Sequence, residues 1–206
     1  MNIQEMLAWN KEAGKILCNL GNYPIVFPDY SNGTARVSEQ ESKIILCALL
    51  WQENIPFSVE TPTMEKYKFT GEGYTSARSD LTVYAENKKD RLWNIELKAH
   101  NAQQKNIDKD FEKLAREQIP GNWFHTLGNA DSGTIKALIE KFNKALENAG
   151  GIKKDLIISM VVIDKKTMFT YVLHKDDPKI PNIDYSVSGG EITVSNLNGW
   201  EQHSCS

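Results

Sequence analysis

The sequence predicts an α/β fold with a central mixed β-sheet flanked by helices. Stretches with apolar residues at helical spacing alternate along the chain with short apolar runs typical of strands. This mixed order is typical of helices packed around one sheet. The 206 residues, 40% of them hydrophobic, suffice for the core of one compact domain. We therefore expect a single domain over residues 1–206, with an N-terminal helix and linker (1–36), a core (37–175), and a C-terminal hairpin and tail (176–206).

Two helices are expected before the first strand. In residues 3 to 20, apolar side chains recur at helical intervals, and Gly21-Asn22 follows as a stop signal. A second helix should run from about Ser38, a good N-cap, to about Glu53. Glu41 lies in its first turn and shares one stripe with the apolar residues Ile44, Ile45, Ala48 and Leu49. A carboxylate is therefore expected at the start of an otherwise apolar helix face.

An antiparallel hairpin is expected over residues 76 to 101. A strand at residues 55 to 63 and a glycine-rich loop at residues 70 to 74 precede it. Two runs of alternating apolar and polar residues then flank a polar turn at residues 86 to 90, which is the sequence form of a hairpin. One side of this hairpin should be apolar, and the other should carry polar and charged groups.

The turn of this hairpin sets which residues face each other. If it is centred on Lys88, residues whose numbers add up to 176 stand in opposition. That rule pairs Asp80 with Glu96, and Arg78 with Lys98. Opposed Cβ atoms in such a ladder are only ~5 Å apart. Two carboxylates held that close repel each other unless a cation lies between them.

The rest of the chain is expected to continue the alternation of helices and strands. Gly150-Gly151 should end the longest of these helices. The expected elements are a helix at 107–118, a short strand at 123–127, an amphipathic helix at 132–149, strands at 156–163 and 168–174, and a hairpin at 185–195 followed by a loose tail.

The polar side of the hairpin carries the groups that phosphodiester hydrolysis needs. Carboxylate and carbonyl oxygens are the ligands that Mg²⁺ or Mn²⁺ prefers, and such a metal would relieve the repulsion between Asp80 and Glu96. Lys98 lies two residues beyond Glu96 on the same side, where it can reach a water or phosphate beside the metal. A Lewis acid and a positioned cation are the two components of metal-assisted hydrolysis.

These residues resemble the PD-(D/E)xK superfamily of restriction-endonuclease-like nucleases. The resemblance rests on Asp80, the Ile95-Glu96-Leu97-Lys98 run, and a preceding helix that carries Glu41. It covers residues 37 to 100 with usable motifs. Ser79 replaces the proline that gives the motif its first letter, which lowers the specificity of the match.

The resemblance implies a role for each residue of the motif. Asp80, Glu96 and the Leu97 carbonyl would bind Mg²⁺ or Mn²⁺, and Glu41 would complete the site. Lys98 would assist the attacking water. The fold implied is a restriction-endonuclease-like core, and the activity is cleavage of nucleic acid, with DNA preferred over RNA, in restriction, defence or repair. A homodimer is common among such nucleases.

Further residues near the motif are candidate site residues, and some of them have an alternative interpretation. Arg78 is a candidate phosphate contact or the partner of a surface acid such as Glu72. His100 is a candidate substrate group or an ordinary surface histidine. Lys109 or Lys113 is expected to lie near phosphate. Glu39, two residues before Glu41, is the competing helix acid, because either fits the first turn of a helix.

The composition excludes several classes of protein. With 24 basic and 27 acidic residues, the net charge of −3 lacks the global cationic field of a nucleic-acid coat protein. Three widely spaced cysteines argue against a disulfide framework and a thiolate zinc site, and we expect a cytoplasmic protein without a membrane partner. Two rival interpretations remain: a nuclease-fold binding or assembly module that does not cleave, and a non-enzymatic domain whose E-x-K triplet is accidental.

Overall fold

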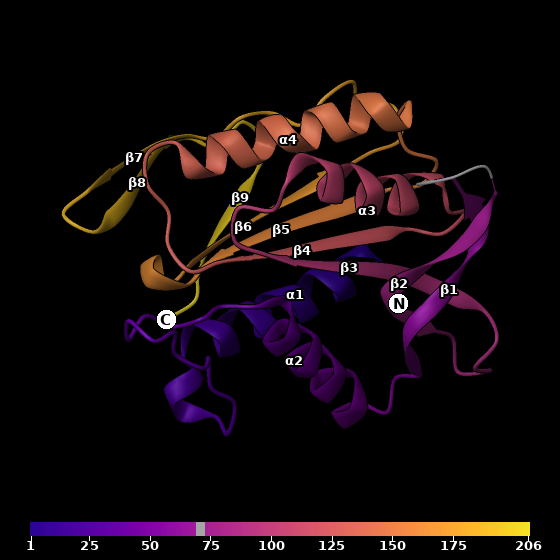
Figure 1. Cartoon of the computed structure of the whole chain (residues 1–206), viewed down its shortest axis with the longest axis horizontal. Helices are drawn as coiled ribbons and strands as arrows, with labels where there is room; N and C mark the ends of the chain where they lie inside the picture. The colour runs from indigo at the N-terminus through magenta and orange to yellow at the C-terminus, as the bar shows by residue number, and fades with distance from the viewer. Residues whose placement is uncertain (69–72) are drawn as a thin grey trace.

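A mixed β-sheet forms the centre of the protein. The computed structural model describes residues 1–68 and 73–206, so the loop expected at 70–74 and Glu72 lie partly or wholly outside the described residues. The described residues form a seven-stranded sheet in the order β1-β2-β3-β4-β5-β6-β9 (Figure 1). β3, β4 and β5 are parallel, and the remaining pairs are antiparallel. The predicted α/β fold with a mixed sheet is confirmed. The strands are β1 (Phe57–Tyr67), β2 (Thr75–Tyr84), β3 (Arg91–Ala99), β4 (Gly121–Leu127), β5 (Leu156–Val162), β6 (Thr167–Leu173) and β9 (Glu201–Ser204).

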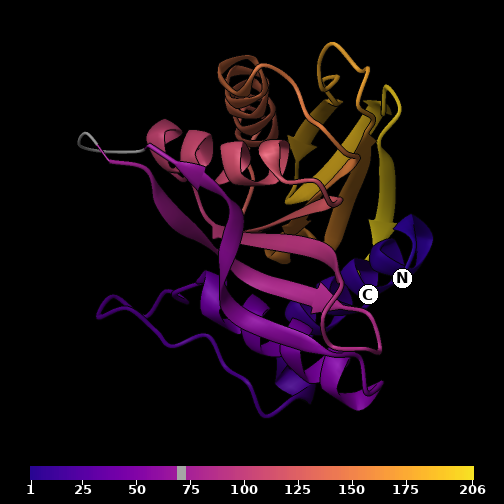
Figure 2. The same ribbon diagram turned by 90° about the vertical axis from the view of Figure 1, so that its right-hand side faces the viewer.

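Helices cover both faces of this sheet. α1 (Ile3–Cys18) and α2 (Glu39–Gln52) lie on one face, and α3 (Gln104–Arg116) and α4 (Thr134–Ala149) lie on the other (Figures 1 and 2). Each face has its own cluster of buried apolar side chains. Because successive residues of a strand point to opposite faces, β4, β5 and β6 contribute to both clusters, whereas the buried apolar residues of β2 and β3 belong only to the cluster beneath α1 and α2. Short 3-10 helices follow α1 (Leu20–Asn22) and β5 (Ile163–Lys165).

The helix ends follow the predicted signals. Ser38 caps α2, with its hydroxyl accepting a hydrogen bond from the Gln40 N–H. Gly150 ends α4 in a left-handed conformation (φ +72°), which glycine adopts without steric cost. The buried stripe of α2 differs from the predicted one, since Ile44 is 54% exposed and Ser42 is buried. The helix is therefore rotated relative to the predicted orientation, which matters for its acidic residues.

The β2–β3 register follows the rule predicted from the turn. The observed pairs include Leu81 with Ile95 and Val83 with Trp93, whose numbers add up to 176 as predicted. All four side chains are buried in the cluster beneath α1 and α2. The described ladder ends at the Leu81–Ile95 pair, so Asp80 and Glu96 come directly after the last paired residues. The predicted pairing of Arg78 with Lys98 falls beyond this end.

The C-terminal segment differs from its prediction in one respect. The predicted hairpin is present as β7 (Asp184–Ser188) and β8 (Glu191–Asn196). The prediction of a loose tail was wrong, because β9 pairs with β6 and Trp200 is buried beside Tyr171, with ring centroids 5.2 Å apart. The physical reason is that β6 would otherwise be an edge strand with unpaired backbone groups.

The described part of the chain has no helix that is both long and apolar enough to cross a membrane. Its three cysteines are free thiols. Two of them, Cys18 at the end of α1 and Cys205 after β9, share a hydrogen bond although they lie 187 positions apart in the chain. The pairing follows from the docking of β9, which the sequence pattern did not reveal.

Candidate active site

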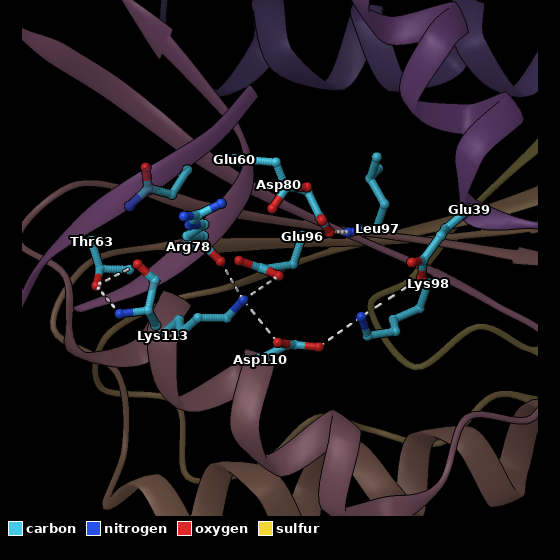
Figure 3. A network of polar contacts seen from close by, with 12 residues as sticks. Glu39, Glu60, Thr63, Arg78, Asp80, Glu96, Leu97, Lys98, Asp110 and Lys113 are labelled. Atoms are coloured by element: carbon cyan, nitrogen blue, oxygen red, sulfur yellow. Dashed lines mark hydrogen bonds and ion pairs between the residues drawn. The ribbon is translucent and has the colours of Figure 1, made fainter. Parts of the chain in front are cut away.

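The site lies where β2 and β3 separate. Beyond the Leu81–Ile95 pair, the Asp80 carboxylate takes the place of the next strand partner, and its Oδ2 accepts a hydrogen bond from the Leu97 N–H at 2.8 Å (Figure 3). The N–H and C=O of one residue in a strand point to the same edge. The Leu97 carbonyl therefore also faces the gap that Asp80 occupies. The end of the ladder thus brings carboxylate and carbonyl oxygens together.

Glu96 is a buried carboxylate with one oxygen paired and one unpaired. Its side chain is 1% exposed, and Oε2 accepts a hydrogen bond from Lys113 Nζ at 2.7 Å. Oε1 is fully buried and has no hydrogen-bond partner among the described residues. Burial raises the pKa of Glu96 well above its usual value; Lys113 opposes this shift, and the nearby Asp110 and Asp80 charges add to it. An unpartnered buried carboxylate oxygen is costly, so it indicates a missing cation or donor.

Lys98 lies on the same side of β3 and is held by two acids. Its Nζ lies 2.6 Å from Asp110 Oδ2 and 3.8 Å from Glu39 Oε2 (Figure 3). Burial alone would lower the pKa of Lys98, but the charge and hydrogen bond of Asp110, together with Glu39, raise it above its usual value. The lysine therefore carries its positive charge at neutral pH, and its side chain keeps 15% exposure.

Helix α3 adds two charged residues that face this strand. Asp110 Oδ1 lies 2.8 Å from Lys113 Nζ, and Lys113 also donates to the Arg78 carbonyl at 2.7 Å. Asp110 was not predicted from the sequence as a site residue. A signal for it existed, because Asp110 falls within the apolar spacing formed by Ile107, Phe111 and Leu114, where a charged residue needs a buried partner.

Glu39, rather than Glu41, is the helix acid that reaches the E-x-K element. Glu41 is buried, but its carboxylate accepts a hydrogen bond from the Ser38 hydroxyl within the same turn. Two residues along a helix correspond to a rotation of roughly 200°, so Glu39 and Glu41 point in nearly opposite directions. The structure therefore places Glu39, and not the predicted Glu41, beside Lys98, while the choice of Glu41 as the fourth site member stays a prediction.

The different positions of Glu39 and Glu41 predict different results for the two matched variants. We expect Glu39→Gln to lower the cleavage rate and the affinity for Mn²⁺ by up to about tenfold, because it removes a negative charge beside Lys98. Glu41→Gln should leave both unchanged and instead lower thermal stability slightly through its capping turn. Steady-state rates and Mn²⁺ calorimetry on both variants, with thermal unfolding as a control, test this. A larger functional effect from Glu41→Gln than from Glu39→Gln would support Glu41 as the fourth site residue.

Lys43 of α2 links Asp80 to an acid on β1. Its Nζ lies 3.3 Å from Asp80 Oδ1 and 2.7 Å from Glu60 Oε1. Glu60 has a left-handed backbone (φ +50°) between the paired β1 residues Val59 and Thr61. This conformation is uncommon for a residue with a side chain, and such strain often occurs at functional sites. Neither Lys43 nor Glu60 was predicted from the sequence.

A cavity of about 440 Å³ opens beside these groups. It contains the predicted Asp80, Glu96 and Lys98 together with Arg78 and Lys109, whose side chains are exposed. The structure therefore brings five predicted residues into one cavity. Among the described residues its lining consists of Glu60, Ser76, Ala77, Arg78, Asp80, Glu96, Lys98, Lys109, Asp110 and Lys113.

His100 lines a different, smaller cavity of about 250 Å³ beside Gly128 and Thr134. It has a left-handed backbone (φ +56°), and its carbonyl accepts a hydrogen bond at 2.6 Å from Nε2 of His125. Because a carbonyl only accepts and the Trp123 indole N–H only donates, His125 carries its proton on Nε2 and accepts from Trp123 on Nδ1. His100 thus directly follows β3, which carries the site, but it lines a different cavity.

The oxygen donors present fit a hard divalent cation. In residues 1–68 and 73–206, no three histidine, cysteine, aspartate or glutamate side chains form a group that could hold a metal ion on their own. Mg²⁺ is, however, commonly held by one or two carboxylates, with waters and substrate phosphates as its other ligands. Asp80, the unpartnered Oε1 of Glu96 and the Leu97 carbonyl match that smaller set.

Comparisons with known proteins provide no assignment. No family model matches the chain, and neither a curated protein nor a solved structure shows significant similarity to it. Any function must therefore be argued from the residues and geometry of the site.

Proposed function

We propose that the protein is a metal-dependent nuclease that hydrolyses phosphodiester bonds, with DNA as the preferred substrate and RNA second. The observation that carries this proposal is the buried, unpartnered Oε1 of Glu96, next to Asp80 and in a cavity that also contains Lys98. A divalent cation would satisfy this oxygen and offset the repulsion between the two carboxylates. This is the arrangement that the PD-(D/E)xK resemblance implies.

Each residue has a distinct role in the proposed reaction. Asp80, Glu96 and the Leu97 carbonyl would hold Mg²⁺ or Mn²⁺, which supplies a Lewis acid that polarises the phosphate and acidifies a water. Lys98 orients the attacking water and stabilises the charge that develops on the phosphate. Asp110 and Glu39 keep the Lys98 ammonium charged and in position.

Local rather than global charge would attract the substrate. The exposed Arg78 and Lys109 lie on the lining of the cavity, where cations can meet a phosphate backbone. This compensates for the net charge of −3. The resemblance further suggests a role in restriction, defence or repair, with two copies of the chain acting together to cut both strands, and the cysteine pattern suggests a cytoplasmic location.

The direct test is a cleavage assay on labelled single-stranded DNA, double-stranded DNA and RNA. We expect cleavage with Mg²⁺ or Mn²⁺, none with chelator, and none with Asp80→Asn, which keeps the shape of Asp80 but removes its charge. Calorimetry with Mn²⁺ provides an independent measurement of metal binding. Metal-independent cleavage, or equal cleavage by Asp80→Asn, would sink the proposal.

A second candidate is a nuclease-fold module that binds nucleic acid or a partner without cleaving it. The observation that favours it is that Lys43, Lys98 and Lys113 already pair with the site's carboxylates. An accidental E-x-K in a non-enzymatic domain would predict neither metal binding nor nucleic-acid binding. A mobility shift of labelled DNA in a gel-shift assay, without cleavage or Mn²⁺ binding, would favour the non-cleaving binding module.

A further inference from the structure

We propose that Lys113 is the resident counter-cation of the candidate active site, which neutralises Glu96 in the metal-free protein and opposes the binding of a divalent cation there. This inference rests on the proposed function, because it concerns the cation at the same carboxylate. It assigns a role to α3, which lies outside the motif that the sequence analysis identified.

The contacts of Lys113 define it as an internal cation. Its side chain is 6% exposed and points between the strand and the helix (Figure 3). Its Nζ has three acceptors: Glu96 Oε2 at 2.7 Å, Asp110 Oδ1 at 2.8 Å and the Arg78 carbonyl at 2.7 Å. An ammonium group has three N–H donors, so all of them are used within the protein. None remains to orient a water or contact a phosphate.

Lys98 differs from Lys113 in this respect. One acid contacts Lys98 closely, at 2.6 Å, and the second lies 3.8 Å away. Its side chain is also more exposed than that of Lys113, 15% against 6%. The two lysines therefore have different roles: Lys98 has N–H donors left for the reaction, while Lys113 neutralises buried acids.

The position of Lys113 has two opposite effects on the energy of the site. In the metal-free protein it compensates for the burial of Glu96 and Asp110, and removing one partner of a buried ion pair is strongly destabilising. For an incoming Mg²⁺ or Mn²⁺, however, the same positive charge at Glu96 is repulsive, and repulsion between buried charges is poorly screened. Loss of the Lys113 charge should therefore lower the folding stability of the metal-free protein and increase its affinity for the metal.

Lys113→Met tests this, because methionine has a similar length and no charge. In chelator we expect the melting temperature to fall by on the order of 10 °C. By calorimetry, Mn²⁺ should bind to the variant about tenfold more tightly than to the wild type. Mn²⁺ should also raise the melting temperature of the variant by more than it raises that of the wild type. Arg116→Met is the matched control, since Arg116 lies one turn further along α3 in a half-exposed pair with Glu112.

A second variant covers a failure of Lys113→Met to fold. Lys113→Gln removes the charge but can still donate to Glu96 and the Arg78 carbonyl, and it should also bind Mn²⁺ more tightly. A protein that folds only when Mn²⁺ is present would support the inference as well. The control Arg116→Met should bind Mn²⁺ with wild-type affinity.

The two proposals fail in different ways. Unchanged or weaker Mn²⁺ binding by both Lys113 variants would overturn the counter-cation role, while binding by the wild type leaves the nuclease proposal standing. Absence of Mn²⁺ binding in the wild type and in both Lys113 variants would overturn both. Calorimetry and thermal unfolding need no nucleic-acid substrate. They therefore distinguish these outcomes from a cleavage assay that failed because its substrate was unsuitable.

Discussion

Lys98→Ala is expected to lower the rate of metal-dependent DNA cleavage by about 100- to 1,000-fold. Lys98 has donor capacity left for substrate, unlike Lys113, and the Asp110 and Glu39 carboxylates hold its pKa above the usual value. It is therefore protonated at neutral pH and can stabilise the charge that develops on the phosphate. Initial rates measured with saturating Mn²⁺ test this expectation.

Two controls separate this effect from a loss of folding or of general charge. Lys105→Ala removes an exposed lysine from the first turn of α3 and should cleave at the wild-type rate. Mn²⁺ affinity of Lys98→Ala should stay within a few-fold of the wild type, because Asp80 and Glu96 are unchanged. A Lys98→Ala protein that is folded, binds Mn²⁺ and cleaves normally would refute the role of Lys98.

The protein is expected to lose about 3 kcal/mol of folding stability through His125 as the pH falls from about 6.5 to about 4. Burial lowers the pKa of His125 to about 4, although its hydrogen bond to the His100 carbonyl opposes the shift. Below pH 6.5 the unfolded chain binds a proton at this histidine and the folded protein does not. Stability is therefore complete above the unfolded pKa of 6.5 and is lost as the pH falls toward 4.

Urea unfolding of the wild type and His125→Gln at pH 7 and pH 4.5 isolates this contribution. The glutamine amide can still donate to the His100 carbonyl, but it does not titrate. The variant should therefore lose less stability between the two pH values than the wild type does. Burial also lowers the pKa of His203, but that residue is present in both proteins and cancels in the comparison. Equal losses would show that His125 is not responsible.

Much of the fold could be predicted because its signals are local. The turn at residues 86–90 sets the β2–β3 register, and the alternation of apolar residues assigns one side of this hairpin to the core. The helix boundaries at Ser38 and Gly150 follow from capping chemistry within a few residues. By contrast, β9 consists of polar residues, and its place in the sheet depends on the open edge of β6.

The candidate site was only partly predictable for the same reason. Asp80, Glu96 and Lys98 belong to one hairpin, so their proximity follows from a short-range register. Glu39 could not be told from Glu41, because the sequence does not specify how α2 is rotated against the sheet. A two-residue difference reverses the direction of the side chain, and the rotation is set by which residues of α2 the core buries.

The sequence by itself determined the α/β pattern, the hairpin register and the acid, acid and lysine set at its polar end, since each depends on neighbouring residues. Only the tertiary structure decided which charges surround that set. Lys43, Asp110 and Lys113 come from α2 and α3, whose contacts with the strands depend on helix docking across both faces of the sheet. Docking is decided by the packing of the whole core, and no local pattern of residues encodes it.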